Sequence, residues 1–327
     1  MFYKTLFIFI FGISIINAKD AIESQIERSK IDVNKSNFDK NDNEGIKDLV
    51  TTEPTDAGTQ QIVELKSLGD YLWINTSSRY RYTDNFFLVE GPLSEAMTVV
   101  WENSIDTGFK SGDFWIGGIP IQASASIGMT RVINGAGSND NFEQFDYDSN
   151  RISTGITAFM GEYRFDFGVN MQRLVDFRNG YDTSFKNFDI VTSINRFHLL
   201  KEKFLFSSTW QLGYSFTHVD EVKLGNFLIQ DNDRLNNLYS YLSFQYYHKI
   251  GSFILVPKIT VGLNEYTENT NNNRTDYTLS LGINGYYNFF KYLNLNIYSQ
   301  YNLKDSDNPS THDYKEFSTG IEISASN

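Results

Sequence analysis

The stretch Thr275–Leu303 reads TDYTLSLGINGYYNFFKYLNLNIYSQYNL and indicates the fold of the chain. Apolar or small residues alternate with polar ones from Tyr277 to Phe289, and the pattern resumes at Leu293 after a short joint at Phe290–Tyr292. A period of two is typical of a β-strand with one apolar and one polar face. Both arms exceed the roughly five or six residues of an average strand. The pattern therefore predicts a hairpin of transmembrane barrel strands, with lipid on one face and water on the other.

The composition agrees with a β-barrel and argues against a helical membrane protein. Mean hydropathy is −0.37, and no stretch after residue 20 is apolar enough to span a bilayer as a helix. Aromatic residues make up 16% of the chain, with 27 Phe and 20 Tyr against 4 Trp, which fits aromatic girdles at membrane interfaces. A soluble two-sheet sandwich would also alternate, so composition by itself leaves both folds open.

Cysteine content and net charge narrow the class of protein further. The chain has no cysteine, which fits an exported protein without disulfides and argues against a lipoprotein anchor at a processed cysteine. The formal net charge is −12, so we expect no nucleic-acid partner. No motif indicates a cofactor.

The N-terminal segment differs in composition from the rest of the chain. Residues 1–18 are predicted to be a secretory signal peptide, because Lys4 precedes an apolar run to Ile16 and the small Ala18 follows. An uncleaved membrane anchor is the alternative. Residues 19–66 are rich in charged and small polar residues, so we expect a disordered, partly helical periplasmic arm. A plug or a docking arm for a periplasmic partner is the functional alternative.

Residues 67–327 are predicted to form one all-β domain, a transmembrane antiparallel up-and-down β-barrel of about 12 strands. The joints between strands alternate strictly between short and long, and the long ones are polar. Bacterial outer-membrane barrels have short periplasmic turns, longer external loops and both termini in the periplasm, whereas a soluble sandwich has no reason to sort its turns. The expected strands are 71–83, 97–108, 118–132, 150–160, 162–174, 184–198, 203–218, 235–248, 253–266, 275–289, 292–304 and 313–325.

The alternation also assigns each side chain to a face of the barrel. In strand 118–132 the apolar residues from Ile119 to Met129 are predicted to face lipid, and in strand 162–174 those from Tyr163 to Met171. Pro257 fits poorly, because proline removes a ladder hydrogen bond from a closed sheet. We expect a bulge there.

Charged residues on the opposite face are predicted to line a pore. Strands 71–83, 97–108 and 313–325 adjoin once the barrel closes, so their arginines and carboxylates are expected to meet. The field of these groups would select ions or small polar solutes; a paired network that fills the barrel is the alternative. The predicted pore-lining residues are Arg79, Arg81, Glu102, Asp106, Glu162, Arg164, Asp166, Lys258, Glu316 and Glu322.

Two further kinds of site are weaker hypotheses. The acidic long loops, for example Asp140 to Asp148, could bind divalent cations that bridge lipopolysaccharide phosphates, but solvated loops are the simpler account. The run Asp305 to Glu316 has some calcium-loop spacing yet has Ser310 where a glycine is needed, so we reject an EF-hand. Catalysis by His218 or His312 has no support from spacing, and His198 and His248 are expected at the other rim; we predict no enzyme.

Short motifs at both ends of the barrel resemble the beta-barrel porin 2 family. They are Arg79-Tyr-Arg-Tyr-Thr-Asp-Asn-Phe-Phe-Leu88, Arg274-Thr-Asp276, Tyr301-x-x-x-Asp-Ser-Asp-Asn308 and Asp313-Tyr314. The resemblance spans about Tyr71 to Ser326 and implies an outer-membrane barrel, with some relatives linked to exopolysaccharide export or surface assembly. The chain departs from the pattern by ending in Ile323-Ser-Ala-Ser-Asn327 without a terminal aromatic residue.

These observations together predict a porin-like channel in a bacterial outer membrane for passive passage of ions or small polar solutes. A non-conducting barrel that scaffolds or exports a surface polymer is the alternative. The expected partners are outer-membrane lipid and lipopolysaccharide, the outer-membrane assembly machinery and a periplasmic partner of residues 19–66.

Overall fold

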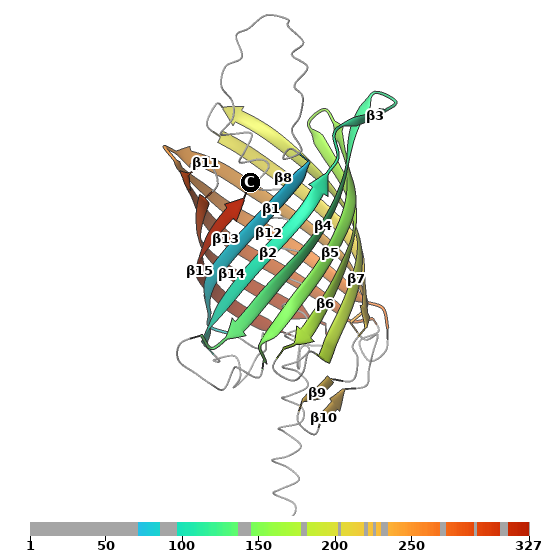
Figure 1. Ribbon diagram of the computed structural model, residues 1–327, viewed down its shortest axis with the longest axis vertical. Helices are drawn as coiled ribbons and strands as arrows, with labels where there is room; N and C mark the ends of the chain where they lie inside the picture. Colours follow the sequence, from blue (N-terminus) through green and yellow to red (C-terminus); the bar gives the residue numbers. More distant parts are fainter. Residues whose placement is uncertain are drawn as a thin grey trace, which may run out of the picture. The chain divides into compact units, whose positions relative to one another are not determined.

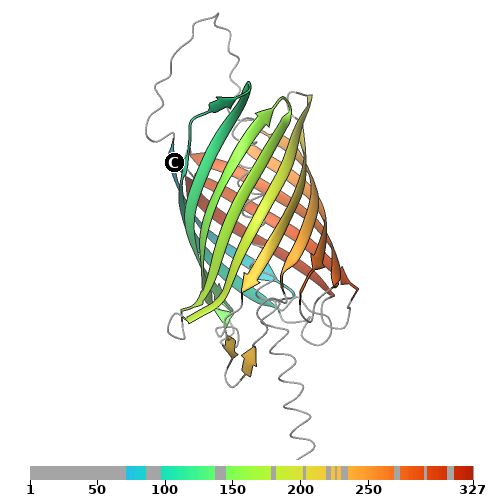
Figure 2. The same ribbon diagram turned by 90° about the vertical axis from the view of Figure 1, so that its right-hand side faces the viewer.

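The computed structural model of this chain is a closed barrel of long, tilted antiparallel strands (Figures 1 and 2). It describes residues 71–85, 97–136, 145–177, 182–201, 204–218, 222–224, 227–229, 235–268, 273–290, 293–307 and 313–326. The predicted signal peptide and periplasmic arm lie outside these residues. No helix among the described residues is long and apolar enough to cross a membrane.

Twelve long strands form the wall, which confirms the predicted number and order. They are β1 (Leu72–Thr83), β2 (Thr98–Lys110), β4 (Ile119–Asn134), β5 (Tyr147–Met160), β6 (Tyr163–Asp176), β7 (Asp182–Lys201), β8 (Phe204–His218), β11 (Asn237–Ile250), β12 (Phe253–Tyr266), β13 (Thr275–Phe290), β14 (Leu293–Ser306) and β15 (Tyr314–Ser326). Three short strands were not predicted: β3 (Phe114–Ile116), which pairs with β4, and β9 (Val222–Leu224) with β10 (Phe227–Ile229), a small hairpin between β8 and β11.

The barrel closes between the first and last strands. β1 pairs with β15 over nine residue pairs, from Asn75↔Ser326 to Thr83↔Ser318, and every other long strand pairs with its neighbours along the chain. Closure leaves no open sheet edge, so the backbone hydrogen bonds of the wall are satisfied within it, as a spanning segment in hydrocarbon requires.

Connections at the two ends of the barrel differ as the sequence predicted. At one end, here the short-turn end, β5, β7, β11 and β13 join the next strand after two residues. Gly161 and Gly251 start two of these turns with φ of 62°, a conformation that favours glycine in tight hairpins. At the other end, here the long-loop end, the joints are longer, and the β9–β10 hairpin lies there (Figure 1).

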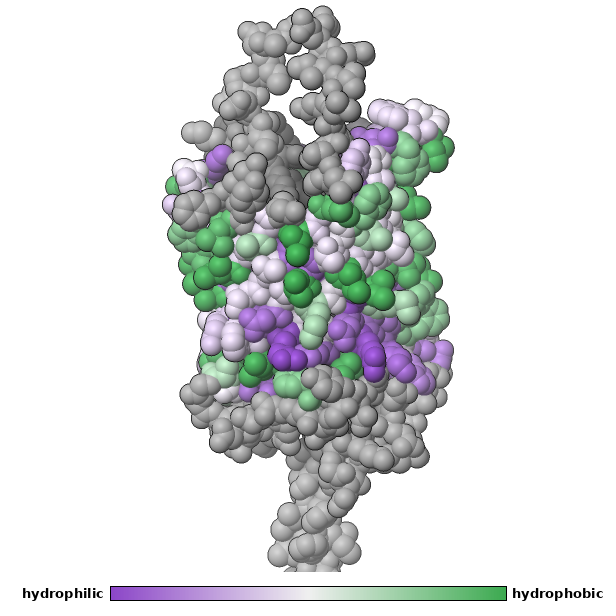
Figure 3. Space-filling model, in the orientation of Figure 1, coloured by the Kyte–Doolittle hydropathy of each residue, from purple (hydrophilic) through white to green (hydrophobic). Residues whose placement is uncertain are grey.

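Side chains alternate strictly between the two faces of the wall. On the twelve long strands, the large apolar residues that stay exposed all have outward parity, including Ile127, Ile152, Met171 and Ile297. Figure 3 shows apolar side chains on the face in view, with hydrophilic side chains gathered near the long-loop end. Because these large apolar side chains are exposed on the outer face, this face is suited to contact with lipid.

The bulge expected at Pro257 is absent. The pairs Gln245↔Lys258 and His248↔Leu255 on either side of Pro257 follow one register, and the β12–β13 ladder runs through Pro257↔Ile283 without a shift. Proline therefore costs local pairing with β11 but inserts no extra residue. Register shifts occur instead at Leu174/Val175, Leu199/Lys201 and Asn288/Phe290, near strand ends.

Candidate functional site

The inner face of the wall is polar almost throughout. On β8, for example, Ser207, Thr209, Gln211, Ser215 and Thr217 alternate with outward aromatic and apolar residues. This face is therefore the candidate functional site. Many of its charged side chains pair with one another, and four groups are described below.

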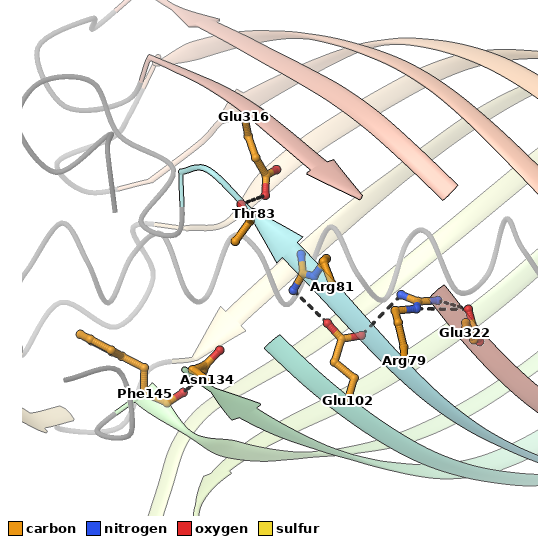
Figure 4. A network of polar contacts seen from close by, with 8 residues as sticks. All are labelled: Arg79, Arg81, Thr83, Glu102, Asn134, Phe145, Glu316 and Glu322. Carbon is orange, nitrogen blue, oxygen red and sulfur yellow. Dashed lines mark hydrogen bonds and ion pairs between the residues drawn. The ribbon is translucent and has the colours of Figure 1, made fainter. Parts of the chain in front are cut away.

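The first group joins the two strands at which the barrel closes. Arg79 lies directly opposite Glu322 on β15 and Glu102 on β2, and its guanidinium nitrogens lie 2.8 Å and 3.5 Å from their carboxylates (Figure 4). Arg81 forms an ion pair with the second carboxylate oxygen of Glu102, with Nη2 2.9 Å from Oε1. The predicted meeting of these four side chains is present. Two positive and two negative charges thus balance within one patch of wall.

Asp106 was expected from the sequence to join this group. In the structure Asp106 pairs instead with Arg151 on β5. Their atoms Oδ1 and Nη2 lie 2.5 Å apart, and both side chains are buried. The pair reaches across β4, where Gly128 is the register partner of both residues. A Cβ on Gly128 would lie 1.9 Å from Asp106 Oδ1, so only glycine leaves room for this contact.

The third group lies on β6 and its neighbours. Arg164 Nε lies 3.0 Å from Asp166 Oδ1, and Asp166 also accepts hydrogen bonds from Thr157 and Ser193. Three donors around one carboxylate fix its orientation.

The fourth group was not among the predicted pore-lining residues. Asp276 accepts from Arg274 at 3.0 Å and from Ser306 at 2.6 Å, and Lys304 Nζ lies 3.4 Å away. The exposed fractions of these three charged side chains are 5% or less. Arg274 also lies 3.6 Å above the ring centroid of Tyr266. Breaking such a buried cluster leaves an unpaired charge in a poorly hydrated place.

The remaining predicted residues occupy different environments. Glu316 is buried and accepts hydrogen bonds from Thr83 (2.7 Å; Figure 4) and Asn302 (2.8 Å). Lys258 has inward parity on β12. Glu162 lies in the turn between β5 and β6, where its carboxylate is 2.9 Å from Arg196 and 64% exposed, so the structure locates it at the rim and not on the inner face.

Inward aromatic rings lie along the wall over glycines of the next strand. A Cβ on Gly213 would approach Tyr239 to 2.4 Å, and one on Gly262 would approach Tyr241 to 2.3 Å. Gly320 and Gly108 have the same relation to Tyr298 and Trp73. The glycines therefore let large side chains fold against the strand instead of projecting inward.

The described histidines lie near the two ends of the wall, and the ends of the rejected calcium loop lie on its two faces. His198 and His248 have outward parity near the short-turn end, each beside an aromatic ring, and His312 lies outside the described residues. Asp305 and Glu316 lie on opposite faces of the wall. Within the described residues, no group of three or more acidic or histidine side chains could hold a metal ion.

Comparisons with known proteins give the fold. No family model and no curated protein matches the chain. Among solved structures, it is similar to the COG4313 outer membrane channel from Pseudomonas putida F1, with TM-score 0.51 and 11% identity over 82% of this chain and 100% of that one.

This chain has the fold of an outer-membrane barrel channel. Weaker similarities are to the β domain of the Bordetella autotransporter BrkA (TM-score 0.43, 12% identity, 78% of this chain and 98% of that one) and to the NanC porin (0.38, 11%, 77% and 98%). The barrel implied by the resemblance to the beta-barrel porin 2 family is thus confirmed, while membership of that family stays a prediction.

Proposed function

We propose that this barrel is an outer-membrane channel for passive passage of ions or small polar solutes. The observation that carries the proposal is the inner face, which is mostly polar and holds several groups of paired charges. A barrel whose interior is simply filled by side chains needs no polar inner face, since burying apolar side chains there would cost less free energy than burying paired charges. The similarity to an outer-membrane channel supports the same reading. Passive passage of solutes requires no catalytic residue.

The location proposed is a bacterial outer membrane. The apolar outer face supports insertion in lipid, and the asymmetry of turns and loops supports an orientation with both termini in the periplasm. Outer-membrane lipid, lipopolysaccharide and the assembly machinery are the partners that this location implies. A periplasmic partner of residues 19–66 is part of the same proposal.

Single-channel recording from the refolded chain in a planar bilayer tests the proposal. We expect discrete conductance steps, both with and without residues 19–66. Steps that appear only after truncation would identify the arm as a plug. Silence from both forms, with folding verified by heat-shifted gel mobility, would exclude a channel.

A barrel that does not conduct is the second candidate. The Arg274–Asp276–Lys304 cluster favours it, because three almost fully buried charges near the long-loop end fill space that an open passage would need. Such a barrel would scaffold or export a surface polymer, and the silent outcome above would favour it.

A further inference from the structure

One joint at the short-turn end differs from the others. Between β2 and β4 the chain takes eight residues, 111–118, and forms the extra strand β3, which pairs with the start of β4. Gly117 and Gly118 have φ of 59° and 84°, as a tight two-residue turn between the two strands requires. We call residues 114–121 the β3 hairpin. This joint is therefore a folded element and not an irregular loop.

The β3 hairpin carries exposed apolar side chains along its short strand. The exposed fractions are 41% for Phe114, 66% for Trp115 and 59% for Ile116. The value for Trp115 is the highest among the exposed large apolar side chains of the described residues. Large apolar side chains that gather on a surface in this way mark a contact with lipid or with another molecule.

The outward side of the hairpin continues the lipid-facing surface of the wall. Phe114 is the register partner of Ile121, and Ile116 is the register partner of Ile119. Ile119 and Ile121 have the outward parity of β4, which continues within the wall to Ile127. In Figure 1 the hairpin, labelled β3, leans away from the line of the wall. Its apolar side therefore faces the membrane and not the mouth of the barrel.

The other side of the hairpin is less apolar. At its base, the side chain of Gln122 donates a hydrogen bond to the carboxylate of Asp113. Nearer the tip, Trp115 lies opposite Pro120, and both have the parity of the inner face. An indole ring combines an apolar body with one N–H donor, so it suits the level of the lipid headgroups.

The backbone of β3 limits how deep the hairpin can lie. Among the described strands β3 pairs with β4 alone, so one edge of β3 is open. The two residues that flank a two-residue turn pair through both of their backbone groups, so the N–H and C=O of Trp115 point to the open edge. Open strand edges do not occur in the hydrocarbon of a bilayer, whereas water and headgroups can satisfy them at its interface.

We propose that the β3 hairpin is an interfacial anchor, which binds the phospholipid surface of the leaflet at the short-turn end. Phe114 and Ile116 reach the first part of the acyl chains, and Trp115 lies among the headgroups. The anchor fixes the height of this side of the barrel in the bilayer. This inference rests on the membrane location given under the proposed function, and it is independent of solute passage.

Fluorescence of single-tryptophan forms of the full chain, refolded in phospholipid vesicles, tests the proposal. One form keeps Trp115 and the other keeps Trp210, an outward residue near the middle of β8, with the remaining tryptophans replaced by phenylalanine. Phospholipids brominated near the headgroup or near the chain end are the quenchers. We expect the shallow bromine to quench Trp115 best and the deep bromine to quench Trp210 best.

Substitutions on the hairpin show whether its apolar side holds it at the interface. Phe114→Ser with Ile116→Ser should remove most of the lipid quenching of Trp115 and shift its emission to longer wavelength, because the driving force for burial is lost. Ile250→Ser is the matched control, since Ile250 is 55% exposed at another short turn. It should leave the Trp115 signal unchanged.

Three results would overturn the proposal. They are quenching of Trp115 by aqueous iodide and not by brominated lipid, quenching of Trp115 as deep as that of Trp210, and an unchanged Trp115 signal in the double variant. The Trp210 form separates this inference from the proposed location. Lipid quenching of Trp210 with Trp115 in water contradicts the anchor alone, whereas an absence of lipid quenching in both forms contradicts the membrane location as well.

Discussion

Gly128 shows how a single missing side chain sets a contact across three strands. Asp106 and Arg151 lie on strands that do not pair with each other, and Gly128 is the only residue between them in the register row. The contact therefore depends on the absence of a Cβ as much as on the two charges.

Gly128→Ala is expected to destabilise the barrel by about 1–3 kcal/mol, because the new methyl group must displace a carboxylate held by Arg151. Urea unfolding of the barrel refolded in vesicles measures this change. Gly282→Ala is the matched control: it is also an inward glycine, and its added Cβ would meet nothing closer than 3.7 Å. An equal loss in both variants would contradict the explanation.

Asp276 is expected to be the most sensitive carboxylate of the inner face. Asp276→Asn keeps the shape but removes the negative charge that Arg274 and Lys304 both contact, which should lower the free energy of unfolding by about 3–5 kcal/mol. Guanidinium titration in micelles measures it. Asp305→Asn, on the exposed outer face of β14, should be within experimental error of the unmodified chain. A small effect at Asp276 would mean that water reaches the cluster.

Some charge contacts of the inner face could be predicted from sequence and others could not. Parity and barrel closure suffice for Arg79 with Glu102 and Glu322, since neighbours in chain order must be neighbours in the wall. Arg151 was missed because its contact with Asp106 depends on the exact register, which a period of two leaves undetermined. Arg274 was missed although it lies two residues from Asp276 on the same face, a spacing visible in the sequence. A glycine in one register row with two charges was the available signal for Arg151.

The positions of the long strands can be predicted from the alternation of apolar and polar residues, but local irregularities of these strands cannot. Every long strand was predicted to within a few residues, because lipid on one side and polar groups on the other impose a strict period. Three register shifts and the short strands β3, β9 and β10 were not predicted, since they depend on the packing of strand ends. At Pro257 the sequence correctly indicated a missing hydrogen bond and wrongly indicated a bulge.

Pro257→Val is expected to stabilise the barrel by about 0.5–1.5 kcal/mol. Valine supplies the N–H that β12 lacks toward β11, in a register that already runs unchanged past this position. The unfolding midpoint in urea should rise. Ile259→Val, an equally outward substitution on the same strand, controls for the change of surface and should lower or leave the midpoint. Destabilisation by Pro257→Val would mean that the proline relieves a strain in the wall.

For the molecule as a whole, the proposed channel makes a prediction about charge selectivity. Replacing Arg79 and Arg81 with Gln leaves Glu102 and Glu322 uncompensated on the inner face, so the reversal potential in a salt gradient should shift toward cation selectivity. The reciprocal double variant, Glu102→Gln with Glu322→Gln, should shift it toward anions, while Arg196→Gln at the rim should leave it unchanged. Shifts of opposite sign require that ions pass this patch of wall. Conducting barrels with the same reversal potential in all three variants would place the ion path elsewhere.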